Sequence, residues 1–180
     1  MFIQTEHTPN PNVLKFFPGV KILDSGTADF VTFSDASGHK LPEMLWEIQG
    51  VCGVMLGVDF VSVSKTEDAE WDVLKPQIFG VLVEYFTTGS DFVRPVTEDE
   101  EVECTDEVSK KIQEIIDTKV RPSVIEDGGN IVFKGYKDGI VYLKLQGACA
   151  GCPSASVTLK DGIENLLQYY IPEVREVQQV

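Results

Sequence analysis

Residues 131–153 read IVFKGYKDGIVYLKLQGACAGCP, and this stretch has the clearest fold signal in the chain. Two runs rich in β-branched and aromatic residues, 131–136 and 140–145, flank Lys137-Asp138-Gly139. A short turn with Asp-Gly between two such runs is typical of a β-hairpin. The stretch therefore predicts two antiparallel strands that lead directly into a loop with two cysteines.

A helix is predicted before the hairpin. Apolar residues recur at helical spacing over residues 108–116, after Thr105, whose hydroxyl is expected to cap the first turn. Pro122 interrupts or kinks this pattern, because it lacks the backbone N–H that a helix interior needs. Gly128-Gly129 then ends the helix before the first strand.

A second helix is predicted after the cysteine loop. Apolar residues follow helical spacing from Ser154 to Tyr170, and Pro172 stops the pattern. Residues 174–180 are expected to add a final strand. The order helix, hairpin, helix, strand predicts a small α+β domain over residues 105–180.

The loop itself has the residue types of a metal or redox site. Two residues separate Cys149 from Cys152, which lets both sulfurs face one metal ion or one edge of a cluster. Gly151 permits the tight turn between them, and Pro153 suits the first position of a helix. Cys152 is then expected at the positive end of the helix dipole, where the metal-binding thiolate form is stabilised. A zinc site, a redox centre and two buried structural thiols share this pattern.

The number of ligands narrows these alternatives. A cubane cluster or a structural zinc ion normally takes four protein ligands, and this pair supplies two. Cys52, Cys104, His7 and His39 each lack a partner at ligand spacing. The simplest completion is a second copy of the chain, which gives a symmetric site with two cysteines from each subunit. A cluster held at such an interface is exposed and transferable, which favours a carrier and not an enzyme.

A thioredoxin-like thiol–disulfide oxidoreductase is the main alternative, because its cysteine pair also opens a helix after a strand. That fold needs several more strands after the helix, and about ten residues follow Tyr170. Pro153 also follows the pair instead of lying inside it. A zinc-bridged dimeric binding module stays open as a further alternative.

The N-terminal half predicts a second α+β domain. Residues 91–104 contain six acidic residues against one basic residue, which is typical of a linker. The predicted boundaries are therefore a domain at 1–90, an acidic linker at 91–104 and a cysteine-containing domain at 105–180. In the first domain we expect strands at 2–6, 14–17, 30–33, 51–56 and 60–64, and helices at 42–50 and 71–89.

The overall charge and hydropathy exclude some classes of function. A net charge of −14 argues against a nucleic-acid partner, because the phosphate backbone needs Lys and Arg opposite it. No apolar run has the roughly 18–20 residues that a membrane span needs. Residues 1–6 resemble neither a secretory signal nor a transit peptide. We therefore expect a cytoplasmic protein, or one whose targeting segment has been removed.

Several motifs resemble those of the Nfu-type proteins with a NifU-like C-terminal domain. The second half contains VRPSVIEDGG at 120–129, GACAGCP at 147–153 and GIENLL at 162–167. The first half contains QTEHTPNPN at 4–12 and LKF at 14–16, which resemble the N-terminal domain of that family. The resemblance covers essentially the whole chain.

This resemblance implies an iron–sulfur cluster scaffold or carrier without enzymatic activity. It implies a [4Fe–4S] cluster held between two subunits and transferred to apo-proteins such as aconitase-like and lipoyl synthase-like enzymes, with upstream assembly factors as further partners. Cys149 and Cys152 match the family's ligand positions, whereas Cys52 and Cys104 lie outside its motifs and receive no role. The family occurs in bacteria and in mitochondria, and the lack of a transit-like segment favours a bacterial cytoplasm.

Overall fold

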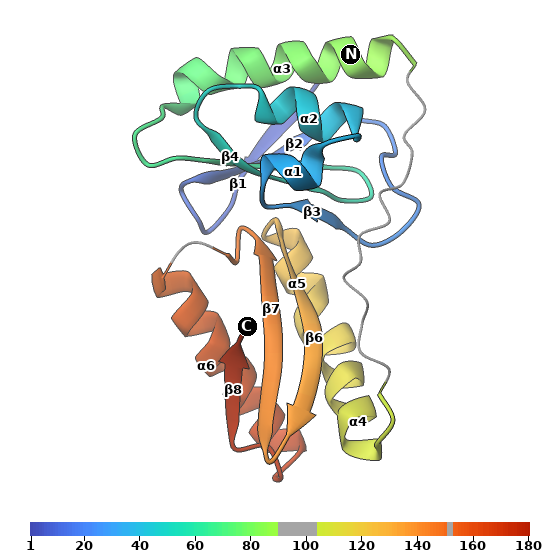
Figure 1. Ribbon diagram of the computed structural model, residues 1–180, viewed down its shortest axis with the longest axis vertical. Coiled ribbons are helices and arrows are strands. Elements are labelled where there is room, and N and C mark those ends of the chain that lie inside the picture. The colour runs from blue at the N-terminus through green and yellow to red at the C-terminus, as the bar shows by residue number, and fades with distance from the viewer. Residues whose placement is uncertain (90–103, 151–152) are drawn as a thin grey trace. The chain divides into compact units, whose positions relative to one another are not determined.

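The computed structural model describes residues 1–89, 104–150 and 153–180 (Figure 1). The chain divides into two compact units, one from residue 1 to 97 and the other from 98 to 180. Each unit has its own sheet, helices and hydrophobic core, so the predicted α+β class is confirmed. The linker predicted over 91–104 lies outside the described residues apart from Cys104, and the three domain boundaries therefore stay a prediction.

The first unit is an antiparallel sheet with helices packed on one face. The sheet has the strand order β1-β2-β5-β4-β3. The strands are β1 (Gln4–His7), β2 (Val13–Phe17), β3 (Ala28–Phe30), β4 (Val51–Leu56) and β5 (Val61–Lys65), and the helices are α1 (Phe33–Ala36), α2 (Lys40–Trp46) and α3 (Trp71–Thr87).

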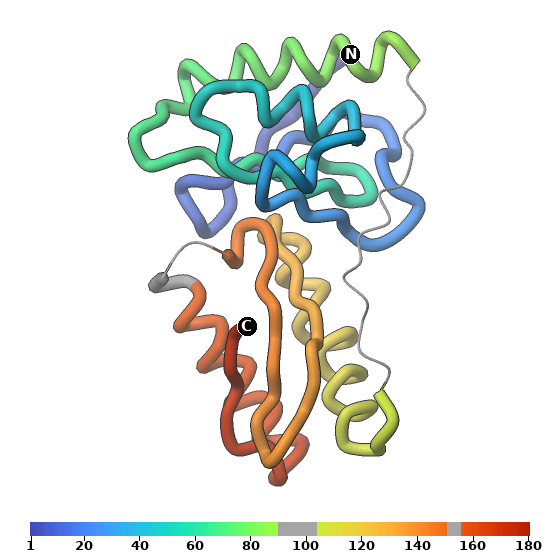
Figure 2. The backbone as a smooth tube through the Cα atoms, viewed as in Figure 1, coloured from blue at the N-terminus to red at the C-terminus, as the bar shows by residue number. Residues whose placement is uncertain are grey.

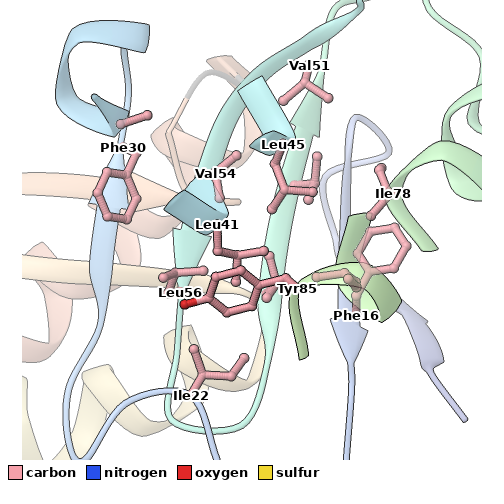
Figure 3. Packing of buried hydrophobic residues seen from close by; sticks show 14 of the residues in the cluster. Phe16, Ile22, Phe30, Leu41, Leu45, Val51, Val54, Leu56, Ile78 and Tyr85 are labelled. Carbon is pink, nitrogen blue, oxygen red and sulfur yellow. The ribbon is translucent and has the colours of Figure 1, made fainter. Parts of the chain in front are cut away.

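The core of the first unit forms where alternate strand residues meet one side of each helix (Figure 3). Leu14 and Phe16 are two residues apart on β2 and both are buried in this cluster, as the period of a strand requires. Leu45 of α2 and Ile78 of α3 are buried against them. The Phe16 ring meets the Phe79 ring edge to face, with ring centres 5.7 Å apart.

The strand predicted over residues 30–33 is correct only at Phe30. β3 ends at Phe30, and Thr32 is the N-cap of α1. The Asp35 N–H donates to Thr32 Oγ1 at 3.2 Å, while the Thr32 N–H donates to Asp35 Oδ2 at 2.8 Å. This reciprocal pair is a capping box, and it satisfies two backbone donors at the start of the helix. Local capping therefore overrides the strand propensity of Val31 and Phe33.

The second unit has a three-stranded mixed sheet, and its path is easiest to follow in Figure 2. The strand order is β6-β7-β8, with β6 and β7 antiparallel and β7 and β8 parallel. The final strand predicted near the C-terminus is confirmed as β8. The elements are α4 (Glu107–Ile115), the π-helical turn η1 (Ile116–Val120), α5 (Arg121–Glu126), β6 (Gly129–Lys137), β7 (Ile140–Gly147), α6 (Pro153–Tyr170) and β8 (Glu176–Gln179).

The predicted cap of the first helix of this unit is wrong by one residue. Asp106, and not Thr105, is the N-cap of α4, and its carboxylate accepts a 2.9 Å hydrogen bond from the Ser109 N–H. Pro122 lies in the first turn of α5, where its missing N–H leaves no helical hydrogen bond unmade. Helical structure thus continues through η1 up to α5, and Pro122 does not end it.

The predicted hairpin turn has the required backbone conformation. Asp138 and Gly139 both have positive φ, at 52° and 84°. Two successive residues of this kind match the twist of the flanking strands. A Cβ on residue 139 would also lie 3.0 Å from the Arg175 side chain, so the turn packs closely against the segment before β8.

The helix α6 connects the two parallel strands and packs on the sheet. Ile163 and Leu167 of α6 are buried with Ile131, Phe133 and Leu143 of the sheet. Glu164 Oε2 accepts a 2.9 Å hydrogen bond from the Val177 N–H of β8. Among the helices described, none is both long enough and apolar enough to cross a bilayer.

Candidate functional site

The cysteine loop lies at one end of the second unit, where β6 begins, β7 ends and α6 begins (Figure 1). Gly129 and Gly147 pair across the two strands at this end. Cys149 follows β7 by two residues, and α6 begins at Pro153, directly after Cys152 in the sequence. Cys152 itself lies outside the described residues.

Hydrogen bonds from both sides hold the backbone around Cys149. The Ala148 N–H donates to the Gly128 carbonyl at 3.1 Å, and the Cys149 N–H donates to the Gln146 carbonyl at 3.3 Å. Ser156 Oγ, in the first turns of α6, donates to the Cys149 carbonyl at 3.0 Å. The loop is therefore attached both to the start of β6 and to the helix that follows it.

The side chain of Cys149 points into the core of its unit. It is 8% exposed and belongs to the hydrophobic cluster that includes Val124, Ile131 and Leu145. Its sulfur lies above the Cα of Gly129, so close that a Cβ on residue 129 would overlap it.

This environment disfavours the thiolate of Cys149. Burial raises the pKa of the Cys149 thiol to about 11, and the nearby Asp127 carboxylate raises it further, because both disfavour the negative form. The predicted stabilisation of a thiolate by the helix dipole concerns Cys152, which lies outside the described residues, and it stays a prediction.

The other cysteines and histidines lie away from this loop along the chain. Cys52 is exposed on β4, and Cys104 is half-buried with its Sγ 3.5 Å from Gln113 Oε1. His39 is the N-cap residue of α2, with its ring centre 5.5 Å from that of Phe30, and His7 is exposed at the end of β1. Within residues 1–89, 104–150 and 153–180, no three His, Cys, Asp or Glu side chains gather as a metal site.

Sequence reasoning missed the residues that surround Cys149. The sequence predicts Gly128-Gly129 as a helix end and places Asp127, Gly128 and Gly129 in a family motif, but it does not predict that they influence Cys149. One signal was present. A helix end needs a single glycine, and Gly128, with φ of 79°, fills that need. Gly129 is not among the glycines of positive φ, so a second reason for glycine had to exist there.

Two family descriptions match the chain, one for each unit. "Scaffold protein Nfu/NifU N terminal" matches residues 3–89, and "NifU-like domain" matches residues 112–178. A human protein named NFU1 iron-sulfur cluster scaffold homolog, mitochondrial, is 49% identical over 183 residues, which cover all of this chain and 72% of that protein. The protein of the same name from Drosophila ananassae is 49% identical over 184 residues.

The fold and the loop define a two-unit α+β protein with a Cys-x-x-Cys sequence between a strand and a helix. Together with these relatives, they show that the chain belongs to the Nfu family of iron–sulfur cluster scaffold proteins. The chain spans 64% of the length of the Drosophila ananassae relative. Among solved structures, a NifU-like protein from Saccharomyces cerevisiae aligns with a TM-score of 0.48 at 25% identity, over 53% of this chain and 86% of that one.

Proposed function

We propose that this protein binds a [4Fe–4S] cluster between two copies of the chain and transfers it to apo-proteins. Cys149 and Cys152 of each copy are the proposed ligands. The observation that supports this most directly is the position of Cys149, on a loop fixed between the end of β7 and the start of α6. Cys152 follows three residues later in the sequence.

The ligand count supports a shared cluster. A cubane cluster takes four cysteine ligands, and each chain offers two at this loop. Cys104 contacts Gln113, and Cys52 belongs to the sheet of the other unit, so neither is proposed as a third ligand. Two copies related by a twofold axis would complete the set, because such an interface uses the same surface of both chains.

The names of the relatives support a carrier over a thiol–disulfide enzyme. The human and Drosophila ananassae relatives are both named iron-sulfur cluster scaffold homologs. We therefore propose a protein without catalytic activity, whose cargo is the cluster.

The proposed location is the mitochondrial matrix. The relatives from human and from Drosophila ananassae are both named mitochondrial, so the bacterial cytoplasm expected from the sequence finds no support among them. The proposed partners are upstream assembly factors and apo-enzymes of the aconitase-like and lipoyl synthase-like classes.

Anaerobic reconstitution tests this function. The chain is incubated with iron and sulfide without oxygen, and the product is measured by Mössbauer spectroscopy and native mass spectrometry. We expect one cubane cluster per two chains and a shift from monomer to dimer. Incubation with apo-aconitase should then restore aconitase activity and return the chain to the monomer.

The Cys149→Ser and Cys152→Ser double variant is the decisive control, and Cys52→Ser is its matched control. Loss of the cluster in the first and retention in the second would support the proposal. A cluster that survives the double substitution would refute it. Binding of zinc without sulfide would support a zinc-bridged dimer instead, and turnover with a dithiol reductant in the absence of iron would support an oxidoreductase.

A further inference from the structure

Gly129 lies directly beneath the sulfur of Cys149, although the two residues are twenty positions apart in the sequence. A Cβ on residue 129 would overlap the Cys149 Sγ, and would also lie 3.0 Å from the Gln146 carbonyl oxygen and 3.1 Å from the Cys149 nitrogen. We call the space above the Cα of Gly129, where this sulfur lies, the thiol seat. The seat exists only because residue 129 has no side chain.

The backbone conformation of Gly129 does not explain the glycine. Gly128 has φ of 79° and ends the helix, whereas Gly129 is not among the residues of positive φ and is the first residue of β6. An alanine can adopt such a conformation without strain. The requirement for glycine at 129 therefore comes from the close approach of other groups. The Cys149 thiol is the nearest of them, and the Gln146 carbonyl oxygen and the Cys149 nitrogen are next.

The thiol, and not the loop, is the part that can move. Hydrogen bonds from Ala148 to Gly128, from Cys149 to Gln146 and from Ser156 to the Cys149 carbonyl hold the backbone. The Sγ is the end of a side chain that turns about a single bond. A group that occupies the seat would meet the sulfur first and turn it outward. The Gln146 carbonyl oxygen and the Cys149 nitrogen, at 3.0 and 3.1 Å from such a group, would then need to shift only by a few tenths of an ångström.

A thiol in the seat cannot at the same time bind a cluster shared with a second chain. The side chain is 8% exposed and packed in the core of its own unit, whereas a cluster between two chains lies outside both cores. We therefore propose that Gly129 is a positioning residue that stores the Cys149 thiol inward, and that cluster binding requires the thiol to leave this seat. Only the claim about cluster binding rests on the proposed function; the inward position of the thiol does not.

The consequence for transfer follows from competition between two positions of one sulfur. The inward position buries an apolar thiol, and the outward position binds the cluster. A stable inward position lowers the apparent affinity for the cluster, which equals the intrinsic affinity multiplied by the fraction of thiol that is outward. The seat would therefore help the protein release its cargo.

Alkylation of the chain prepared without iron tests the seat directly. In the Cys152→Ser background, the rate at which iodoacetamide modifies Cys149 is measured by peptide mass spectrometry at pH 8, with Cys52 of the same chain as reference. We expect Gly129→Ala to raise the ratio of the Cys149 rate to the Cys52 rate at least about tenfold, because the thiol is turned outward. Gly162→Ala, at a helical glycine with open space around it, should leave the ratio unchanged. An unchanged ratio in Gly129→Ala would overturn the proposal.

A second measurement separates release of the thiol from local unfolding. Gly129→Ala is introduced both into the parent and into a Cys149→Ala chain, and the shift in Tm is compared between the two. If the added methyl group meets the sulfur, the substitution lowers Tm less in the chain that lacks the sulfur. Equal shifts in Tm in both backgrounds would show that the added methyl group destabilises the fold through contacts with the backbone and not with the sulfur. That result would also overturn the proposal.

The loaded protein gives a third readout. With the thiol already turned outward, Gly129→Ala should lose its cluster to a chelator several-fold more slowly than the parent, and faster loss would contradict the role of the seat in release. The alkylation and Tm experiments need no iron. If the alkylation and Tm results are as expected but the parent does not take up a cluster, the proposed function is refuted and the inward position of the Cys149 thiol is still supported.

Discussion

At the scale of single residues, the chemistry of the site depends on what surrounds Cys149. The same thiol in water would ionise near its ordinary pKa, and a neighbouring helix start would lower that pKa. Here the side chain is packed in a hydrophobic cluster, and this burial, together with the charge of Asp127, raises the pKa of Cys149 to about 11. A thiol of this kind resists alkylation and oxidation. This would keep a cluster ligand reduced after one cluster is released and before the next is bound.

Asp127→Asn is expected to speed the alkylation of Cys149 in the chain without iron. Burial is the larger cause of the raised pKa, and the Asp127 charge is the smaller one, so removing the charge lowers the pKa only in part. Asp127 is exposed, and solvent screens its charge, so we expect an increase of about twofold to threefold at pH 8 and low salt. Rates by peptide mass spectrometry check this.

Asp161→Asn is the matched control, because it makes the same change in net charge and Asp161 is not a cause of the shift at Cys149. The rate should also rise with pH up to about 11, where the thiol is half ionised, instead of levelling off near 9. A plateau near pH 9 in the parent would contradict the buried thiol.

At the scale of elements, hydrogen bonds at the ends decide where helices begin. Thr32 and Asp35 form a capping box that starts α1 inside a run of strand-forming residues. Asp106 caps α4 through the Ser109 N–H, one residue after the position expected. In each case a side-chain oxygen satisfies backbone donors that the helix leaves free. These contacts set the ends of the elements, while the apolar patterns set their existence.

The cap at Asp106 is expected to make the start of α4 sensitive to acid. Hydrogen bonds from Ser109 lower the pKa of the Asp106 carboxyl below its ordinary value. A carboxyl with a lowered pKa stabilises the fold above its unfolded pKa of about 3.9, and this contribution is lost as the pH falls through the folded value. Protection of the Ser109 amide against hydrogen exchange should therefore stay constant from pH 7 to about pH 5 and fall below about pH 4.

Asp106→Asn isolates the charge from the cap. Asparagine caps helices about as well as aspartate and does not titrate in this range, so protection of Ser109 should no longer depend on acid. Asp106→Ala should lower the protection at every pH. An equal loss of protection in acid for the Asn variant would show that another group is responsible.

At the scale of the whole molecule, the chain has two separate hydrophobic cores. One cluster contains residues of the strands and helices of the first unit, and the other contains those of the second. The proposed cluster ligands belong to the second unit, whose core includes Cys149 itself. The stability of the site is therefore expected to depend on its own unit.

Phe16→Ala tests this independence. Phe16 is fully buried in the first core, and its truncation should destabilise the first unit by about 3–5 kcal/mol. Hydrogen exchange of β6 and β7 and the yield of reconstituted cluster per chain should stay at the parent level. Phe2→Ala, at a phenylalanine that is 81% exposed, is the matched control and should change neither unit. A cluster yield that falls with the stability of the first unit would show that the two units are coupled.

The sequence by itself determined the class of fold, because alternation of apolar residues in strands and their helical spacing are local properties. The hairpin at Asp138-Gly139, the amphipathic helix that follows the cysteines and the short last strand could all be predicted from neighbours in the chain. The sequence also singled out Cys149 and Cys152 as a pair with half the ligands of a cluster. Their role as ligands stays a prediction, to be decided by reconstitution.

Only the tertiary structure decided what surrounds Cys149. The contact with Gly129 joins residues twenty positions apart, and the charge of Asp127 acts on Cys149 through space. A pKa depends on desolvation and on charges that folding brings close, neither of which is visible in a local pattern. The pattern of two cysteines before a helix predicts a stabilised thiolate at Cys152, outside the described residues. It holds no information on the burial that raises the pKa of Cys149.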